Sequence, residues 1–306
     1  MAFKGQSRRP AMIRIAILSG KGGTGKTSVA ASFGYLAGKR AVLCDCDVDA
    51  SNLALVAGAQ NIQSREYSGG MVAVIDPEAC IGCGACARVC RFDAIEKAGP
   101  KYRIEAASCE GCGYCPRVCA FNAISMVERK SGDIFTGQSR FDSAIVYAEL
   151  SIGAENSGKL STQVRRLADE IAEEKDAEVI IIDGPPGVSC PAIAAATGTN
   201  YILFVSEPTL SGVSDLERAM EMARKLKIAA GVLVNRADIN EVLSIKIKEI
   251  TMQAGSDFWG AIPLSSDFVR AVRNGKTVLE ETDDERITSA LTQTWRSILE
   301  RFQKWQ

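Results

Sequence analysis

Short, almost wholly apolar runs recur along the chain, and residues with a helical spacing lie between them. The runs cover residues 13–18, 41–44, 179–182, 201–205 and 232–234. Such runs are typical of strands that are buried on both faces of a parallel sheet. A helical pattern follows the fourth run, for example at Leu216, Met220 and Ala223. Alternation of strands and helices predicts the α/β class, with a doubly wound and mostly parallel sheet.

A glycine-rich segment follows the first apolar run directly. Residues 20–27 read G-K-G-G-T-G-K-T, which fits the phosphate-binding pattern G-x-x-x-x-G-K-[ST], and a helical pattern then runs to Gly38. In such a loop backbone N–H groups close around phosphate oxygens, and the following helix adds its positive N-terminal end. Lys26 is expected to reach the β- and γ-phosphates, and Thr27 to ligate Mg²⁺. The candidate nucleotide-binding residues of this loop are Gly20, Gly22, Gly23, Thr24, Gly25, Lys26, Thr27 and Ser28.

Acidic residues stand directly after two of the apolar runs. Asp45, Asp47 and Asp49 alternate after residues 41–44, and Asp183 follows residues 179–182. On an extended chain the first three would point to one side. Ligands of open α/β sheets bind at the carboxyl ends of the strands, and clustered carboxylates repel unless a cation compensates. We therefore expect Asp183 to hold Mg²⁺ directly or through water, while a solvated acidic turn is the alternative for the first group.

Eight of the eleven cysteines form two identical runs that lie 29 residues apart. Each run reads C-x2-C-x2-C-x3-C, the spacing by which bacterial ferredoxins hold [4Fe–4S] clusters. The repeat extends beyond the sulfurs, because Phe92 recurs as Phe121 and Ile95 as Ile124. In two-cluster ferredoxins the fourth cysteine of each run ligates the other cluster. The expected ligand sets are Cys80, Cys83, Cys86 and Cys119 for the first cluster and Cys109, Cys112, Cys115 and Cys90 for the second.

The composition of the chain limits which metal sites the cysteines can form and which classes of protein the chain can belong to. A pair of four-cysteine zinc sites remains the rival interpretation, although zinc prefers two separated C-x2-C pairs. The absence of histidine excludes histidine ligands and histidine bases. A formal charge of −1 gives no reason to expect nucleic acid or an anionic membrane. No apolar run is long enough to span a bilayer, and the metal-like cysteine spacing favours a cytoplasmic protein over a secreted disulfide scaffold.

The early lysine of the glycine-rich segment points to a particular family. With Lys21 the segment fits K-G-G-x-G-K-[ST], which resembles the "deviant" Walker A loop of the MinD, ParA and nitrogenase iron protein group. The pattern D-x-D-x4-N that begins at Asp45 resembles the first switch of that group, and D-x-P-x-G from Asp183 resembles the second. Taken over nearly its whole length, the chain resembles MinD/Mrp-type P-loop ATPases that carry an inserted ferredoxin domain.

This resemblance implies roles for individual residues. Lys21 would cross a dimer interface to the nucleotide of the partner, and Asp47 would orient or activate the attacking water. Asp45 would support Mg²⁺ and the first switch, and the amide of Gly187 would sense the γ-phosphate. Asn235 would read adenine, with a capping or turn asparagine as the alternative. The implied catalytic residues are thus Lys21, Lys26 and Asp47, the Mg²⁺ ligands Thr27, Asp45 and Asp183, and Pro263 joins the nucleotide-binding set.

The resemblance also implies a domain organisation. Residues 1–66 would form the first part of the ATPase domain, with 1–11 as a flexible extension. Residues 67–130 would form an inserted α+β ferredoxin-like domain with two clusters, and residues 131–306 the rest of the ATPase domain.

Three functions are compatible with these features. The main hypothesis is a Mg²⁺-dependent ATPase that forms a nucleotide-dependent homodimer, or a heterodimer with a paralogous ATPase, and couples ATP state to electron transfer to a redox partner. The second is an ATPase that assembles or carries iron–sulfur or another metallocofactor, although no C-x2-C follows Cys190. The third is a ParA/MinD-like positioning ATPase. It requires the apolar face of residues 287–305 to bind a membrane, whereas packing of this helix on the sheet is the simpler interpretation.

The duplicated cysteine runs generate a compositional test. Protein purified without oxygen should contain about eight iron and eight sulfide per chain, the stoichiometry of two [4Fe–4S] clusters. Elemental and colorimetric analysis of the same sample gives both numbers. Stoichiometric zinc in place of iron would refute the cluster assignment and support the rival zinc sites.

Overall fold

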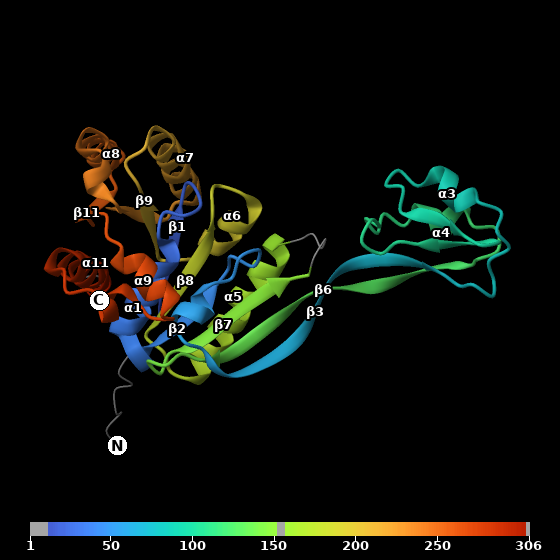
Figure 1. Ribbon diagram of the computed structural model, residues 1–306, viewed down its shortest axis with the longest axis horizontal. Helices are drawn as coiled ribbons and strands as arrows, with labels where there is room; N and C mark the ends of the chain where they lie inside the picture. The colour runs from blue at the N-terminus through green and yellow to red at the C-terminus, as the bar shows by residue number, and fades with distance from the viewer. Residues whose placement is uncertain (1–11, 152–156, 304–306) are drawn as a thin grey trace, which may run out of the picture.

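The computed structural model describes residues 12–151 and 157–303, which form a three-layer body and a small module held away from it (Figure 1). Within the described residues a nine-stranded sheet has the order β11-β10-β9-β1-β8-β2-β7-β6-β3. Seven neighbouring strands run parallel, which confirms the expected α/β class with a mostly parallel sheet. These strands are β1 (Ile13–Ser19), β2 (Ala41–Asp45), β7 (Ala144–Leu150), β8 (Val179–Pro186), β9 (Tyr201–Ser206), β10 (Ala229–Val234) and β11 (Asp257–Ala261).

Helices cover both faces of this sheet because the central strands are buried on both sides. Side chains of β1, β2, β8 and β9 divide between two cores, one on each face. The helices of one face are α5 (Ser157–Glu174), α6 (Cys190–Ala196), α7 (Leu210–Leu226) and α8 (Glu241–Gln253). Those of the other are α1 (Lys26–Ala37), α2 (Leu53–Val56), α9 (Asp267–Arg273), α10 (Val278–Glu281) and α11 (Glu285–Gln303).

The apolar face of α11 is packed inside the body. Ile287, Leu291 and Ile298 are fully buried, and the Trp295 ring lies 5.1 Å from the ring of Phe33 in α1. The simpler interpretation of this helix is therefore correct over its described residues; Trp305 and the N-terminal extension lie outside them. Among residues 12–151 and 157–303 no helix is both long and apolar enough to cross a membrane.

A long antiparallel ribbon connects the module to the body. It consists of β3 (Gln60–Ile75) and β6 (Ile124–Gln138), which pair along almost their entire lengths. Residues 132–138 of β6 also pair with β7, whereas its earlier residues pair with β3 alone. At about 3.4 Å per residue, a 16-residue strand can span roughly 50 Å. The ribbon thus begins as the edge of the sheet and then leaves it, as Figure 1 shows.

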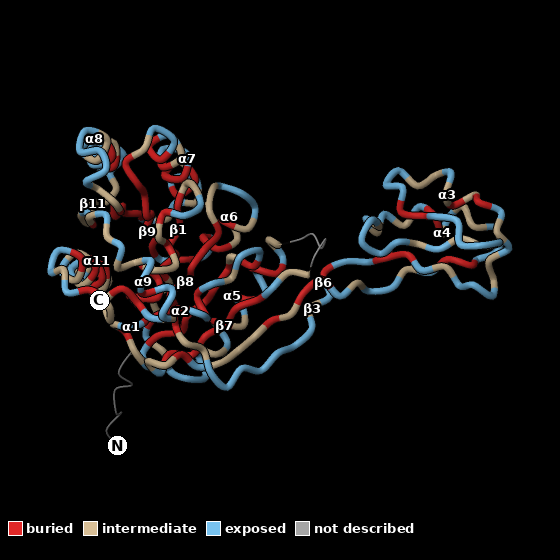
Figure 2. Tube along the Cα trace, viewed as in Figure 1, coloured by how far each residue is buried: buried red, intermediate tan, exposed pale blue. Residues whose placement is uncertain are grey.

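Only residues 71–75 of β3 have the sequence pattern of a strand, whereas the strand itself begins at Gln60. Most residues of β3 are exposed, so this part of the strand has no apolar periodicity that could reveal it. Figure 2 shows the same exposure along the ribbon. The expected boundary between residues 66 and 67 therefore falls inside one continuous strand.

The ribbon is irregular where it leaves the body. Its register shifts between Tyr67 and Met71, opposite the residues at which β6 separates from β7. At this point the N–H of Gly69 donates a hydrogen bond to Ser131 Oγ, over 3.3 Å. Bulges bend and twist a strand pair locally. We refer to residues 67–71 and 130–132 as the ribbon root.

The module at the far end of the ribbon is small. It contains α3 (Ala85–Val89), α4 (Tyr114–Val118) and a two-stranded sheet of β4 (Ile95–Ala98) and β5 (Lys101–Ile104). Its core of buried side chains is formed by Ala73, Cys86, Ile95, Cys115 and Ile124, two of which are cysteines. Units with so little apolar burial usually need metals or disulfides for stability.

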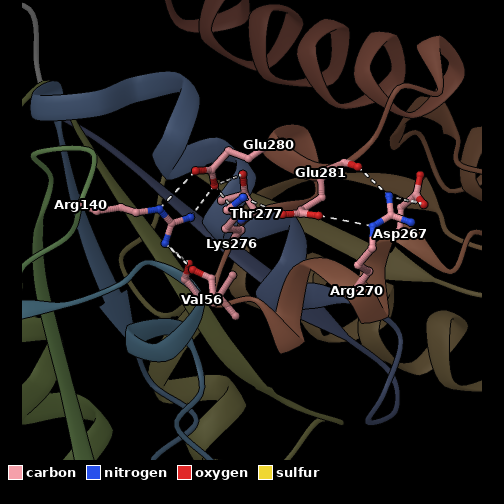
Figure 3. A network of polar contacts seen from close by, with 9 residues as sticks. Val56, Arg140, Asp267, Arg270, Lys276, Thr277, Glu280 and Glu281 are labelled. Atoms are coloured by element: carbon pink, nitrogen blue, oxygen red, sulfur yellow. Dashed lines mark hydrogen bonds and ion pairs between the residues drawn. The ribbon is translucent and has the colours of Figure 1, made fainter.

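A polar network fixes the opposite end of the ribbon strands to the body (Figure 3). Arg140 follows β6, and its guanidinium pairs with Glu280 of α10. The Arg140 guanidinium also donates to the carbonyl oxygens of Val56 and Gly275, and the backbone N–H of Arg140 donates to Ala57 O. Burial alone would raise the pKa of Glu280, but hydrogen bonds from Arg140 and Thr277 outweigh it and lower the pKa.

Arg140→Leu should destabilise the protein at pH 7 by about 1–3 kcal/mol, because charged hydrogen bonds are lost and Glu280 keeps its charge. A carboxylate whose pKa is lowered by folding contributes stability above its unfolded pKa, and this contribution is lost as pH falls through the folded value. The difference between wild type and variant should therefore shrink below about pH 4.5. Urea unfolding at several pH values measures it.

Arg286→Leu is the matched control, because Arg286 pairs with Asp284 while its side chain is 73% exposed. Exposed pairs contribute at most about 1 kcal/mol. Equal losses of stability in the two variants would contradict a structural role for the Arg140 network.

Candidate nucleotide site and cysteine module

A cavity of about 930 Å³ opens at the carboxyl ends of the parallel strands. One wall is the glycine-rich loop and the start of α1, and the other is formed by α9 with the segment after β11. Of the residues expected to bind nucleotide or to act in catalysis, the cavity is lined by Gly22, Gly23, Gly25, Lys26, Thr27, Ser28, Asp47 and Asn235. The structure therefore brings most of the expected nucleotide-binding residues to one place.

The loop has the geometry of an anion-binding site. Gly23 and Gly25 have φ angles of 77° and 99°, which residues with side chains rarely adopt. Gly25 is the N-cap of α1 and offers no side chain to the first turn, so the N–H groups there are available to a ligand. Lys26 is 6% exposed, yet in the part of the chain that the structure describes its ammonium makes no hydrogen bond or ion pair. A buried cation beside free N–H groups fits a phosphate.

Asp183 gives the strongest indication of a cation-binding site. Its carboxyl is buried, and its Oδ1 has no hydrogen-bond partner among the described residues. Burial, followed by the charge of Asp45, raises the pKa of Asp183, whereas Lys26 and a hydrogen bond with Thr27 lower it. Buried polar atoms without partners are rare, and carboxylate and hydroxyl oxygens suit Mg²⁺. Asp183 and Thr27 therefore fit a Mg²⁺ ion; Thr24 Oγ1 is a second buried oxygen without a partner.

Asp45 organises the first switch loop instead of facing the cavity. Its Oδ1 accepts from the N–H of Asp47, and its Oδ2 accepts from the N–H groups of Asn52 and Leu53 and from the Ser51 hydroxyl, over 2.8–3.1 Å. Burial raises the pKa of Asp45 to about 6 in spite of these bonds. Because the chain turns after Asp45, the three alternating carboxylates do not share a side as the extended pattern predicts.

Asp47 and Asp49 do line the cavity. Burial raises the pKa of Asp47, the nearby Lys26 lowers it, and Asp49 raises it further. A carboxylate with a raised pKa is a better proton acceptor than an ordinary one. Of the three acidic residues, Asp47 is the one that lines the cavity and is also partly buried, and its action on water stays a prediction.

Two groups that the family resemblance directs toward a nucleotide, Lys21 and the Gly187 amide, have partners within the chain. Lys21 forms an ion pair with Glu207, and its Nζ lies 3.0 Å from Thr209 Oγ1 and 3.4 Å from Ser211 Oγ. The N–H of Gly187 donates to Ser19 O over 2.8 Å. Both groups would have to exchange these partners to reach a phosphate, so their roles remain predictions.

The remaining expected residues lie near the cavity with structural contacts of their own. Asn235 Nδ2 donates to Thr24 O over 2.8 Å, and its Oδ1 accepts from the Arg236 N–H, so one donor and one acceptor position are left for a base. Gly20 packs against Asp215 of α7. Pro263 does not line the cavity, although the two residues after it do.

Part of this site was not among the residues expected from the sequence. Glu207 joins Lys21 to Arg236, which lines the cavity, and Phe268 and Val272 of α9 form the facing wall. Glu207 directly follows β9, so the same rule of polar residues at strand ends could have found it. The α9 residues belong to no pattern and are placed only by tertiary packing.

The eight clustered cysteines line two small cavities in the module. One cavity contains Cys80, Cys83, Cys86 and Cys119, and the other Cys90, Cys109, Cys112 and Cys115. These are the two crosswise sets that the spacing predicts. No group of three or more cysteine or acidic side chains among the described residues is arranged to hold one metal ion. A zinc ion needs its sulfurs about 2.3 Å from one point, whereas a cluster spreads its four ligands over four irons.

Backbone geometry around the cavities also suits clusters. Gly82, Gly84, Gly111 and Gly113 all have φ angles of 61–74°, and a side chain at Gly82 would clash with the Pro100 carbonyl. Backbone N–H groups of Tyr102 and Gly82 donate to Cys80 and lower its pKa, which favours the thiolate that ligates metal. Burial instead raises the pKa of Cys115 to about 11, which bound iron would have to reverse.

Three cysteines lie outside these cavities. Cys44 and Cys46 are fully buried, with sulfurs 3.6 Å apart, and behave as small core residues. Cys190 is exposed at the start of α6.

A phosphate-binding loop at the carboxyl edge of a parallel sheet, with a buried carboxylate beside it, defines a P-loop nucleotide-binding protein. The chain belongs to the family of CobQ/CobB/MinD/ParA nucleotide binding domains, whose model matches residues 15–278.

Individual relatives agree with this family. The uncharacterized protein MJ0578 of Methanocaldococcus jannaschii is 37% identical over 233 residues, or 76% of this chain and 80% of its own length. A second protein of that organism, the uncharacterized MJ0579, is 26% identical over 89% of this chain and 93% of its own length. The solved structure of the septum site-determining protein MinD with Mg-ADP from Pyrococcus horikoshii shares the fold, with a TM-score of 0.58, 18% identity and coverage of 94% of this chain and 96% of its own.

Asp47→Asn should lower single-turnover ATP hydrolysis at least about tenfold, because an amide is a far poorer proton acceptor than a carboxylate. Nucleotide binding should persist, since Lys26, Thr27 and Asp183 remain. Quenched-flow kinetics and calorimetric binding on the same sample separate the two effects.

Asp49→Asn is the matched control, because Asp49 lines the same cavity but is exposed, and it should turn over normally. Asp45→Asn should lower the melting temperature, because the switch loop loses its acceptor. Normal turnover in Asp47→Asn together with loss in Asp45→Asn would show that the catalytic role belongs to Asp45.

Proposed function

We propose that this protein is an ATP-driven switch in which hydrolysis in the body controls an iron–sulfur module that transfers electrons to a partner protein. The observation that carries the proposal is a continuous set of backbone contacts from the first switch loop to the ribbon root. Family membership supports nucleotide binding, and the two cysteine cavities support the redox module.

The contacts run outward from the candidate catalytic residue. Val48, next to Asp47, accepts a hydrogen bond from the N–H of Leu150 over 3.1 Å. Leu150 is paired with Gly132 of β6, and the N–H of Ser151 donates to Ser131 O over 2.9 Å. Ser131 Oγ then accepts from Gly69 N–H. A movement of the switch loop would therefore have a chain of hydrogen bonds to both strands of the ribbon along which to act.

Residues of the body would act on ATP and Mg²⁺ as their positions suggest. The loop N–H groups and Lys26 bind the phosphates, Thr27 and Asp183 hold Mg²⁺, and Asp47 orients water. The switch loop would adjust when Asp47 engages the nucleotide, while Asp45 keeps the loop ordered. Such coupling requires ATP to bind one arrangement of loop and ribbon better than another.

The module would hold its two [4Fe–4S] clusters through the crosswise sets of cysteines. When bound, these clusters would supply one-electron transfer. The glycines of both repeats, with their positive φ angles, would let the backbone approach the clusters closely, and Cys86 and Cys115 would hold them from the buried core of the module. Exposed Cys83 and Cys112 mark the sides from which a redox partner can approach.

A nucleotide-dependent dimer is part of the proposal. Lys21 would leave Glu207 and contact the nucleotide of a second protomer, since Lys26 suffices within one. The presence in one organism of two relatives that both match this chain suggests a paralogous ATPase as an alternative partner to a second copy.

A positioning ATPase is the second candidate function, and the comparisons favour it. The septum site-determining protein MinD of Bacillus subtilis is 22% identical over 86% of this chain. The module has no evident use in that function, and α11 leaves no apolar face free over its described residues. The metallocofactor-carrier alternative predicts instead that clusters leave the protein intact during turnover.

ATP state should change the accessibility of the clusters through the ribbon root. In anaerobic protein, the rate at which an iron chelator removes iron should differ at least about twofold between the nucleotide-free, ADP and non-hydrolysable ATP forms, a coupling of about 0.4 kcal/mol. Ser131→Ala should reduce that difference, because the hydrogen bond from Gly69 N–H to Ser131 Oγ is lost. Stopped-flow absorbance measures the rates.

Ser125→Ala is the control, since Ser125 lies on the same strand and is exposed. It should leave the nucleotide effect intact. Identical rates in all three nucleotide states of the wild type would make the module a passive attachment and overturn the proposed switch.

A further inference from the structure

The switch loop and helix α9 form two sides of the nucleotide cavity, and both are connected to Arg140 behind it. Asn52 lines the cavity at the end of the switch loop, and Val272 lines it from α9. Arg140 is not one of the lining residues, so any effect that it has on a nucleotide passes through these two sides. The inference rests on the proposed function, because it concerns the nucleotide that the cavity is proposed to bind.

The switch loop reaches Arg140 through the one-turn helix α2. Asn52 O accepts a hydrogen bond from Val56 N–H over 3.3 Å, and Val56 O accepts one from Arg140 Nη1 over 2.8 Å. At the other end of α2, Asp45 accepts from Leu53 N–H over 3.0 Å. The carboxylate and the guanidinium thus satisfy backbone groups that the two ends of a helix leave without partners. Helix α2 is therefore fixed at both ends.

Helix α9 reaches the same nitrogen atom by a matching route. Val272 O accepts a hydrogen bond from Gly275 N–H over 3.1 Å, and Gly275 O accepts one from Arg140 Nη1. Gly275 has a φ angle of 60°, which the turn after α9 requires and which residues with side chains rarely adopt. One nitrogen atom therefore holds both sides of the cavity, each through a single intervening residue.

The guanidinium is fixed from its other edge by Glu280. Arg140 Nε donates to Glu280 Oε1 over 3.2 Å, and the two side chains also form an ion pair (Figure 3). Glu280 in turn accepts from the N–H and the hydroxyl of Thr277, both over 2.8 Å. A planar guanidinium with donors in a rigid fork can bond a carboxylate and two carbonyl oxygens at once, whereas the ammonium of lysine is a compact charge on a flexible stem.

Other contacts hold α9 to α10 independently of Arg140. Arg270 donates to Glu281, and Asp267 accepts a hydrogen bond from the Thr282 hydroxyl. Loss of Arg140 would therefore release the switch loop and α9 from each other, while these contacts still hold α9 in the body.

We propose that Arg140 is a positioning residue for nucleotide binding, which fixes the separation between the switch loop and α9. A cavity whose sides are held in advance binds its ligand more tightly, because less freedom of movement is lost on binding. Arg140 follows β6 closely, so the strand that leads out to the module has its body end behind the nucleotide cavity.

Calorimetric binding of Mg-ADP and of a non-hydrolysable ATP analogue tests this inference in the full anaerobic protein. Arg140→Leu should raise the Kd for both nucleotides at least about tenfold, because the two sides must then be ordered on binding. The single-turnover rate at saturating ATP should stay within about twofold of wild type, the pattern of a change that affects ground state and transition state alike. A loss of stability alone would not separate binding from turnover in this way.

Arg301→Leu is the matched control. Arg301 of α11 pairs with Asp257 over 2.8 Å, with the two side chains 37% and 29% exposed, so a partly buried arginine–carboxylate pair is lost in both variants. Asp257 begins β11, at the opposite end of the parallel strands from the cavity. Distant sites act independently, so this variant should lose stability and keep the Kd for both nucleotides within about twofold of wild type.

The outcomes separate this inference from the function beneath it. Wild type that binds neither nucleotide would overturn the proposed function, and the inference with it. Nucleotide binding by wild type together with an unchanged Kd in Arg140→Leu would overturn the inference alone, as would an equal rise of the Kd in Arg301→Leu or a tenfold loss of the saturating rate in Arg140→Leu.

Arg140→Lys decides the question if Arg140→Leu does not fold. It keeps a positive charge beside Glu280 but loses the planar fork, so the Kd for both nucleotides should rise at least about threefold. An unchanged Kd in folded Arg140→Lys would then overturn the inference.

Discussion

The pairing of β6 with β7 is the contact on which the arrangement of this protein depends. Through residues 132–138 it makes the ribbon a part of the central sheet, and through Leu150 it brings the ribbon root within one hydrogen bond of the switch loop. A flexible linker would have left the module free to sample many positions. A paired strand instead gives it a defined attachment, so that a change in the body can have a directed effect at a distance.

Buried charge at the carboxyl edge of the sheet, where the nucleotide cavity lies, explains why the switch loop can respond to a nucleotide. Asp45 and Asp183 lie opposite each other on β2 and β8, and both have a raised pKa because burial disfavours the carboxylate. Asp45 is partly compensated by four hydrogen bonds from its own loop, but Asp183 has an oxygen without a partner. Mg²⁺ and nucleotide would complete the compensation and thereby change the balance of forces on the loop.

The sequence predicts those features that depend on local patterns. The parallel sheet follows from apolar runs, and the phosphate-binding loop from residues 20–27, because each pattern is continuous along the chain. The length of β3 could not be predicted, since an exposed ribbon has no apolar alternation. The four hydrogen bonds to Asp45 depend on the geometry of its loop, and the contact of Arg140 with Glu280 joins residues that are 140 positions apart. No periodicity in a single sequence reveals either of them.

Hydrogen–deuterium exchange of the unlabelled protein, with and without a non-hydrolysable ATP analogue and Mg²⁺, tests the coupling most directly. It reports the opening of backbone hydrogen bonds along the chain. Exchange is expected to change in the switch loop, residues 45–53, and also at the ribbon root, where Gly69 N–H donates to Ser131 Oγ. Protection of the loop with unchanged exchange at residues 67–71 and 130–132 would contradict it.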